Sequence, residues 1–96
     1  MAKQKPAQIC IVTITGADKV GIIAKVATTM AKAHINIIDV NQKIMEDYFV
    51  MTMAVDITHA SIPIVKIKSR LDKIGSQMEL NITLQDENIF KAMHRV

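Results

Sequence analysis

The sequence is poor in aromatic residues and cysteine, and each shortage excludes a class of protein. Its 96 residues contain no tryptophan, one tyrosine and two phenylalanines. A sheet that binds RNA by stacking needs aromatic side chains on its central strands, and Tyr48 and Phe49 would face opposite sides of theirs. The one cysteine, Cys10, allows no disulfide within the chain, which indicates a reducing compartment. We therefore expect a cytoplasmic protein with an aliphatic core.

Other absences argue against membrane, metal and catalytic functions. No apolar run reaches the roughly 18 residues of a membrane-spanning helix. The three histidines lie in different predicted elements without metal-ligand spacing, and no cysteine pair or arginine occurs in the first strand-to-helix turn. The net charge of +3 is mild, and the lysines near Arg70 are typical of a solvated helix face. We predict no metal, no cofactor, no catalytic residues and no nucleic-acid or membrane partner.

What the chain has is hydrophobic patterning over nearly its whole length. Half of the residues are hydrophobic, which is enough for one small domain over residues 8–96 after a flexible segment over 1–7. Alternating and helical periodicities then define the elements. We expect strands over 8–15, 35–45, 48–57 and 79–85, helices over 19–33 and from 61 to about 74, and a short terminal helix within 86–94.

Particular residues mark the expected boundaries. Gly16 and Ala17 form the first turn, Asp18 caps the first helix, and Gly21 lies in its first helical turn. Ser61 caps the second helix, in which proline is tolerated at the start, and Gly75 ends it. The broken alternation at Ile37-Ile38 indicates either a β-bulge or a segment covered on both faces, and Glu46-Asp47 predicts a tight turn. We expect Ile89, Phe90 and Met93 to pack the terminal helix against the domain.

The order of these elements predicts an α+β fold. A β-α-β-β-α-β order with right-handed crossovers gives a ferredoxin-like sandwich, in which two helices cover one face of a four-stranded antiparallel sheet. The strand over 35–45 is expected at the edge of that sheet. An exposed edge invites pairing with a second copy, so we expect a homodimer.

The turn after the first strand is the best candidate for a ligand site. Free backbone N–H groups and the positive end of a helix dipole suit a small anion such as a carboxylate. Gly21 exposes this backbone, and Asp18 and Asn36 offer groups for an ammonium. Each has a structural alternative: Asp18 as a helix cap, Asn36 as a turn residue, and Gly21 as room for helix–sheet packing.

The pattern Gly16-x-Asp18-x-x-Gly21, followed by Ile35-Asn36-Ile37, resembles the ACT domain. A narrower set is similar to the small stand-alone bacterial and archaeal ACT proteins akin to the glycine cleavage repressor. That set comprises Asp18-Lys19-x-Gly21-Ile22-Ile23-Ala24, Asn36-Ile37-x-Asp39, Gln42, Phe49-x-Met51 and Ile89-Phe90-x-x-Met93-His94-Arg95. Two positions depart from these patterns, because Val20 replaces a common proline and Asp86 replaces a histidine.

The resemblance implies a regulatory domain that senses an amino acid or a similar small metabolite across a dimer interface. The implied ligand-binding residues are Gly16, Ala17, Asp18, Gly21, Ile22, Asn36 and Ile37. Without an attached catalytic domain, such a protein acts through its own oligomer or a regulatory protein partner. Two alternatives stay open: a transcriptional or translational co-regulator, and a structural dimerisation module without ligand.

Overall fold

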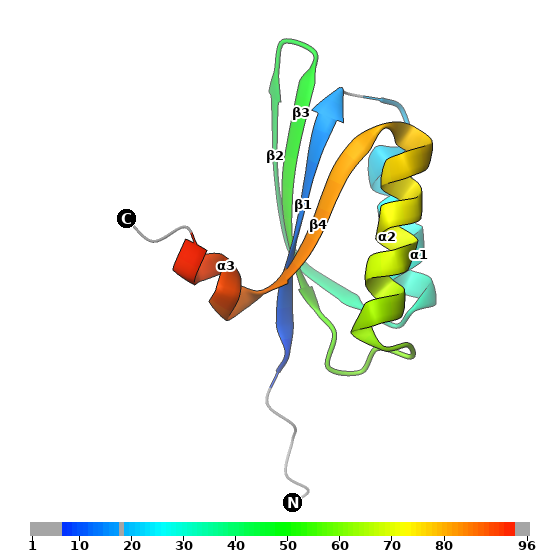
Figure 1. The fold of residues 1–96 in the computed structure, drawn as a ribbon, viewed down its shortest axis with the longest axis vertical. Helices are drawn as coiled ribbons and strands as arrows, with labels where there is room; N and C mark the ends of the chain where they lie inside the picture. Colours follow the sequence, from blue (N-terminus) through cyan, green and yellow to red (C-terminus); the bar gives the residue numbers. More distant parts are fainter. Residues whose placement is uncertain (1–6, 18, 94–96) are drawn as a thin grey trace, which may run out of the picture.

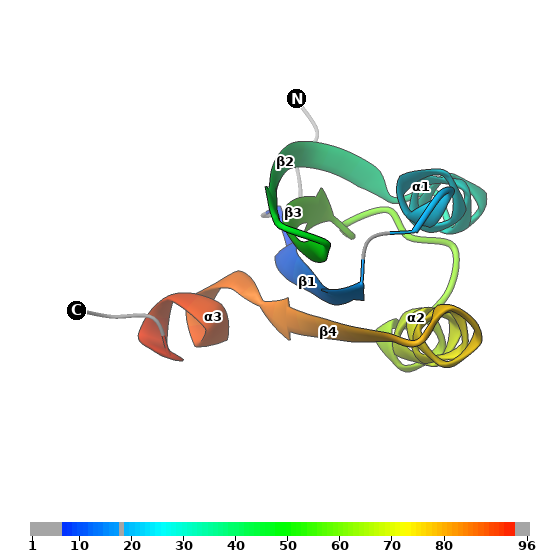
Figure 2. The same cartoon turned by 90° about the horizontal axis from the view of Figure 1, so that it is seen from above.

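The computed structural model describes residues 7–17 and 19–93 and has the predicted order of elements. The strands form one antiparallel sheet in the order β2-β3-β1-β4, and α1 and α2 cover one of its faces (Figures 1 and 2). The ferredoxin-like fold is thereby confirmed, with β2 at an edge of the sheet. The elements are β1 (Ile9–Ala17), α1 (Ile22–Lys32), β2 (Asn36–Met45), β3 (Tyr48–Asp56), α2 (Ile64–Met78), β4 (Leu80–Asp86) and α3 (Glu87–Met93).

The core lies between the sheet and these two helices. Every second residue of β1, β3 and β4 is buried, as the period of two predicts. Ile22, Val26 and Met30 line the buried side of α1 at intervals of four residues. Ile67, Leu71 and Ile74 do the same for α2. Among the described residues, no helix is both long and apolar enough to cross a membrane.

Of the two explanations for the broken alternation in β2, the structure shows the bulge, which decides which side chains of that strand face the helices. The register against β3 shifts between Ile37 and Asp39, so Ile38 is an extra residue. Beyond the shift, Gln42 pairs with Met51, whose side chain is buried under the helices. Gln42 and every second neighbour therefore face the helical side, at an edge of the sheet that α1 leaves partly open.

The start of α1 differs from the prediction. The helix begins at Ile22 rather than Lys19, and Gly16 and Ala17 continue β1 instead of forming a turn. Gly21 occupies the cap position with φ 90°, a left-handed conformation that no residue inside an α-helix adopts. Asp18, the predicted cap, lies outside the described residues.

The second helix extends further at its C-terminal end than the sequence predicted. Gly75 does not stop it, and the helix continues to Met78, with Glu79 left-handed at its end. A Cβ on Gly75 would lie 2.7 Å from the backbone oxygen of Leu80. The glycine is therefore present because β4 passes close to the helix. At the other end, Pro63 rather than Ser61 takes the cap position.

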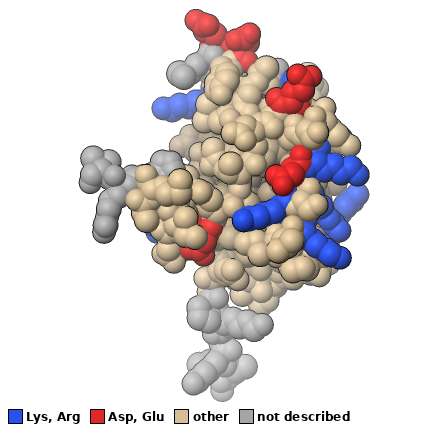
Figure 3. Space-filling view, viewed as in Figure 1, with Lys and Arg blue, Asp and Glu red and all other residues tan. Residues whose placement is uncertain are grey.

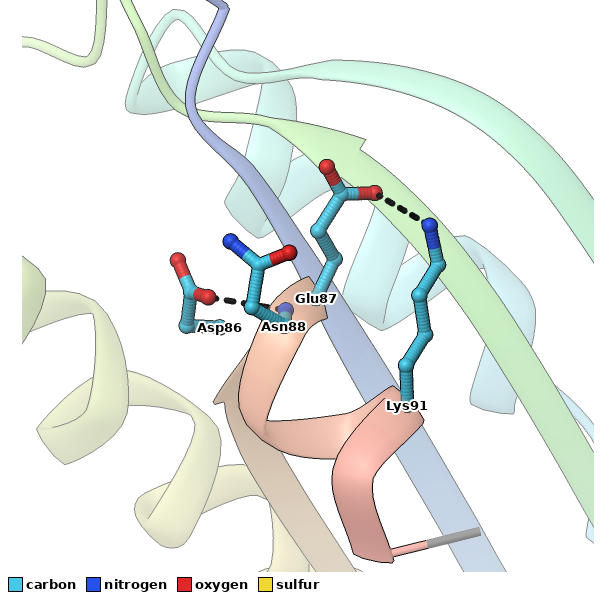
Figure 4. A network of polar contacts seen from close by, with 4 residues as sticks. All are labelled: Asp86, Glu87, Asn88 and Lys91. Atoms are coloured by element: carbon cyan, nitrogen blue, oxygen red, sulfur yellow. Dashed lines mark hydrogen bonds and ion pairs between the residues drawn. The ribbon is translucent and has the colours of Figure 1, made fainter. Parts of the chain in front are cut away.

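The terminal helix α3 forms as predicted, but its expected apolar packing is found only in part. Ile89 and Met93 are 56% and 64% exposed, whereas Phe90 is half-buried. Polar contacts also hold the helix: Gln85 Nε2 donates to Met93 Sδ at 3.2 Å, and Asn88 N–H donates to Asp86 Oδ1 at 2.8 Å. Lys91 Nζ lies 3.7 Å from Glu87 Oε2 (Figure 4). The helix lies beside β4, on the face of the sheet opposite α1 and α2 (Figure 2). Apart from α3, no described helix lies on that face.

Candidate functional site

An open pocket of about 450 Å³ lies between the first turn of α1 and the edge strand β2. One wall is the start of α1, and the other is the helix-facing side of β2 beyond the bulge. Its lining residues are Lys19, Gly21, Ile22, Ile23, Ala24, Gln42, Ile44 and Phe49. We call it the β2 pocket.

Gly21 gives the β2 pocket a bare backbone. A Cβ there would meet no heavy atom within 4 Å, so the glycine is required by its φ of 90° and not by close packing. Among the described residues, no side chain caps α1. The N–H groups of the first turn have no partner within the helix, and they carry the positive end of its dipole. This end of the pocket suits a carboxylate.

Lys19 adds a positive charge to the same end of the pocket. Its Nζ donates a hydrogen bond to the backbone oxygen of Met78 at 2.5 Å, which ties the β1–α1 connection to the end of α2. An ammonium has three donors, so two remain for a ligand. Its place near the last carbonyls of α2 is also favoured by that helix's dipole.

The opposite wall combines one amide with apolar surface. Gln42 offers both a donor and an acceptor, while Ile23, Ile44 and Phe49 offer hydrocarbon surface. The sequence-based site omitted six lining residues: Lys19, Ile23, Ala24, Gln42, Ile44 and Phe49. A signal was present for five of them, because all except Ile44 belong to the narrower pattern of small ACT proteins.

The predicted site residues do not all meet within one chain. Gly21 and Ile22 line the β2 pocket, and Ala17 lies at the same end of the sheet, where it pairs with Tyr48. Asn36 pairs with Asp56, at the opposite end of β3. Asn36 and Ile37 therefore lie about one strand length away from Gly21 in the same copy. Asp18 lies outside the described residues.

Gly16 is explained by packing between strands. With φ 152°, a Cβ on this residue would lie 2.7 Å from Leu80 Cδ2 and 3.3 Å from the backbone oxygen of Glu79. Gly16 is therefore needed where β4 enters the sheet beside β1.

The groups with shifted pKa values lie away from the β2 pocket. Burial, and next the charge of Asp86, raise the pKa of the Cys10 thiol, which favours its neutral form. Hydrogen bonds from the hydroxyl and the backbone N–H of Thr58 lower the pKa of Asp56. Within the described part of the chain, His, Cys, Asp and Glu form no group of three that could hold a metal ion. The polar groups of the β2 pocket, Lys19 and Gln42 among them, can form hydrogen bonds with a small ligand.

Comparison with known proteins finds relatives that match nearly the full chain. A family model of the ACT domain matches residues 8–85. A UPF0237 protein from Clostridium acetobutylicum is 44% identical over 86 residues, which cover 90% of this chain and 97% of that protein. An ACT domain protein of known structure from Streptococcus pneumoniae is 28% identical with a TM-score of 0.75, over 90% of this chain and 97% of that one.

A more distant structure shares the fold alone. This is a protein assigned as a glycine cleavage system transcriptional repressor, which matches with a TM-score of 0.74 at 23% identity. The match covers 85% of this chain and 47% of the repressor.

Proposed function

This chain belongs to the ACT domain family, and we propose that it is a non-catalytic regulatory protein that binds an amino acid or a similar small carboxylate. The ACT fold is a regulatory fold. The observation that carries the proposal is the β2 pocket, in which the first turn of α1 and the Lys19 ammonium face an apolar wall and one amide.

Each part of an amino acid has a counterpart in this pocket. The carboxylate would lie against the first-turn N–H groups near Gly21, with Lys19 as a second source of positive charge. The Gln42 side-chain oxygen would accept a hydrogen bond from the ammonium. An aliphatic side chain would contact Ile23 and Ile44, whose exposed fractions of 46% and 51% leave apolar area to bury.

We propose that a second copy completes the site. The edge strand β2 exposes Ile38, Val40 and Ile44 by 53%, 44% and 51%, an apolar edge of the kind that pairs with another chain. If two β2 strands pair antiparallel about their midpoint near Val40, residue 36 of one copy lies opposite residue 45 of the other. Asn36 and Ile37 of the second copy would then lie near the pocket of the first. Because both copies would contact the ligand, its binding would stabilise the dimer. A regulatory partner that recognises the dimer would then respond to the ligand.

A thermal-shift panel of the twenty amino acids and common small carboxylates, at millimolar concentration, tests the ligand proposal. A ligand at 100 times its dissociation constant adds about 2.7 kcal/mol to the free energy of unfolding. For a domain of this size each kcal/mol raises the midpoint by roughly 4–8 °C, so a true ligand gives a clear responder. A flat panel would contradict sensing and favour a dimerisation module without ligand.

Three variants locate the bound ligand. Gln42→Ala should abolish most of the response, whereas Asn81→Ala, an exposed strand amide away from the pocket, should leave it unchanged. Asn36→Ala should weaken the response only if a second copy completes the site. A response that survives Gln42→Ala at full size would place the ligand elsewhere.

A further inference from the structure

The two helices that cover the sheet carry more positive charge than the whole chain. Together α1 and α2 contain six Lys and Arg residues and one acidic residue, Asp72, a formal charge of +5. The whole chain has +3, so the remainder is net negative by two charges. Figure 3 shows Lys and Arg side chains gathered at the right of the view, over the helices. The net positive charge of the chain is small, but the fold concentrates positive charge on the layer formed by α1 and α2.

Four of these cations meet around one groove between α1 and α2. The groove has a volume of about 290 Å³, and its described lining contains no carboxylate. The ion pair found among the described residues joins Lys91 to Glu87, so no described carboxylate forms an ion pair with the four cations. The lining residues are Lys25, Thr29, Lys32, Arg70, Lys73, Ile74 and Gln77, which we call the basic groove.

Helical spacing explains why these side chains converge. Lys25, Thr29 and Lys32 are separated by four and three residues, which places them on one face of α1. Arg70, Lys73 and Gln77, at intervals of three and four, share one face of α2. Ile74, which is 5% exposed, forms the floor of the groove. Both rows border the same hollow because the two helices lie next to each other on the sheet.

We propose that the basic groove binds a compact anion with several negative charges, namely the diphosphate or triphosphate group of a small molecule. Four like charges around one hollow repel one another, and an anion of comparable charge relieves that repulsion. One carboxylate would neutralise only one of the four. Arg70 provides a planar donor fork for phosphate oxygens, and the lysines provide point charges.

Size and composition favour this class over a nucleic-acid strand. The groove volume of about 290 Å³ is just below the roughly 300–1,000 Å³ range of ligand pockets, which suits a short phosphate group. Among the described residues no aromatic side chain lines the groove, so a base would find no stacking surface there.

This site goes beyond the proposed amino-acid function and is separate from it. The basic groove and the β2 pocket have no lining residue in common. The protein would thus respond to two chemically different small molecules, and the two proposals fail independently.

Titration of the full chain with sodium tripolyphosphate, followed by calorimetry and by amide chemical shifts, tests the assignment. We expect saturable binding with shifts confined to the faces of α1 and α2 that border the groove. Arg70→Gln/Lys73→Gln should weaken binding at least tenfold. The matched control Lys66→Gln/Lys68→Gln removes the same charge from exposed positions of α2 outside the groove and should change the affinity less than twofold.

Several outcomes would overturn the proposal. An equal loss in both double variants would mean that net charge alone attracts the anion. Failure of tripolyphosphate to bind at millimolar concentration, while a single-stranded oligonucleotide or an acidic peptide binds through Arg70 and Lys73, would assign the groove to a macromolecule. Two results would support the proposal and distinguish the natural ligand. Tighter binding of a nucleoside triphosphate than of tripolyphosphate would indicate that the ligand is a nucleotide. Equal affinity would indicate that the groove recognises the phosphate groups alone. Gln42→Ala should leave all these affinities unchanged.

Discussion

At the scale of single residues, the three glycines of this chain serve different purposes. Gly21 adopts a backbone conformation that opens the start of α1, and a side chain would meet open space there. Gly16 and Gly75 instead allow other parts of the chain to approach closely, and both lie against the start of β4 at Leu80. Substitutions at these positions should therefore have different consequences for binding and for stability.

Gly75→Ala should destabilise the protein although alanine is the better helix former. The added Cβ would lie 2.7 Å from the Leu80 backbone oxygen, which belongs to a strand of the sheet and cannot move independently. We expect a net loss of about 1–3 kcal/mol, because overpacking exceeds the gain of roughly 1 kcal/mol in helix propensity. Chemical denaturation measures the loss. The neighbouring exposed Ser76→Ala is the control, and a stabilised Gly75→Ala variant would contradict the packing.

Cys10 should make stability depend on alkaline pH. Its side chain is fully buried, and burial raises the pKa of the thiol above its usual value of 9.0. The unfolded chain therefore ionises first as pH rises. The contribution of Cys10 is fully present below that usual value and is lost as pH rises through the higher folded pKa.

The comparison with Cys10→Ala isolates this effect from the ionisation of lysines. The wild type should be the more stable protein near neutral pH, because alanine leaves a small cavity. Its advantage in the free energy of unfolding should shrink as pH rises above about 9. An advantage that is independent of pH, from parallel denaturation curves, would contradict the prediction.

At the scale of elements, α3 has a polar cap, and none of its described residues is fully buried. Asp86 ends β4 and accepts the Asn88 N–H, so the residue that departs from the narrower family pattern has a structural role here. The Lys91–Glu87 pair is exposed, and such a pair contributes little, roughly 0.3–0.5 kcal/mol. The helix should be the least stable of the three described helices.

Asp86→Ala should fray α3 without unfolding the domain. Loss of an N-cap costs a helix about 0.5–2 kcal/mol. Because none of the described residues of α3 is buried, the cost should stay local. We expect faster amide exchange over 87–93 and a midpoint lowered by only a few degrees. Asp72→Ala, an exposed acid within α2, is the control. Cooperative loss of the sheet in Asp86→Ala would show that α3 supports the core.

At the scale of the whole molecule, the edge strand β2 and the helical layer present different surfaces. The edge strand β2 presents apolar side chains beyond the cover of α1, whereas the helical layer presents positive charge. Charge repels a second copy and an apolar edge attracts one. Self-association should therefore occur through β2 and leave the basic groove accessible.

Val40→Lys should convert the proposed dimer into a folded monomer. Val40 is 44% exposed on the edge strand, so a lysine is tolerated in a single chain but places like charges at a self-paired edge. Sedimentation velocity should show the change of mass, with an unchanged circular dichroism spectrum. Val65→Lys makes the same substitution at a 72% exposed position of α2 and should leave the dimer intact. A monomeric wild type at high concentration would contradict the dimer.

The sequence by itself determined the order of elements, the buried face of the regularly alternating strands and the edge position of β2. These features follow from residue periods within one element, or from connection rules between neighbouring elements. The alternation in β3 is an example, because the buried residues from Phe49 to Val55 are every second one. Gly21 and Ile22 could be placed at a strand-to-helix turn for the same reason, since such a turn is local, and the structure shows that both line the β2 pocket.

Tertiary structure alone decided which distant residues meet. Nothing local in the sequence shows that β4 passes over Gly75, so the glycine was taken for a helix stop. The distance between Asn36 and Gly21 depends on the length of α1 and the pairing of β2 with β3. The convergence of Lys25 and Lys32 with Arg70 and Lys73 depends on two helices packed side by side. Periodicity gives a side chain its face, but only the packed fold gives that face its neighbours.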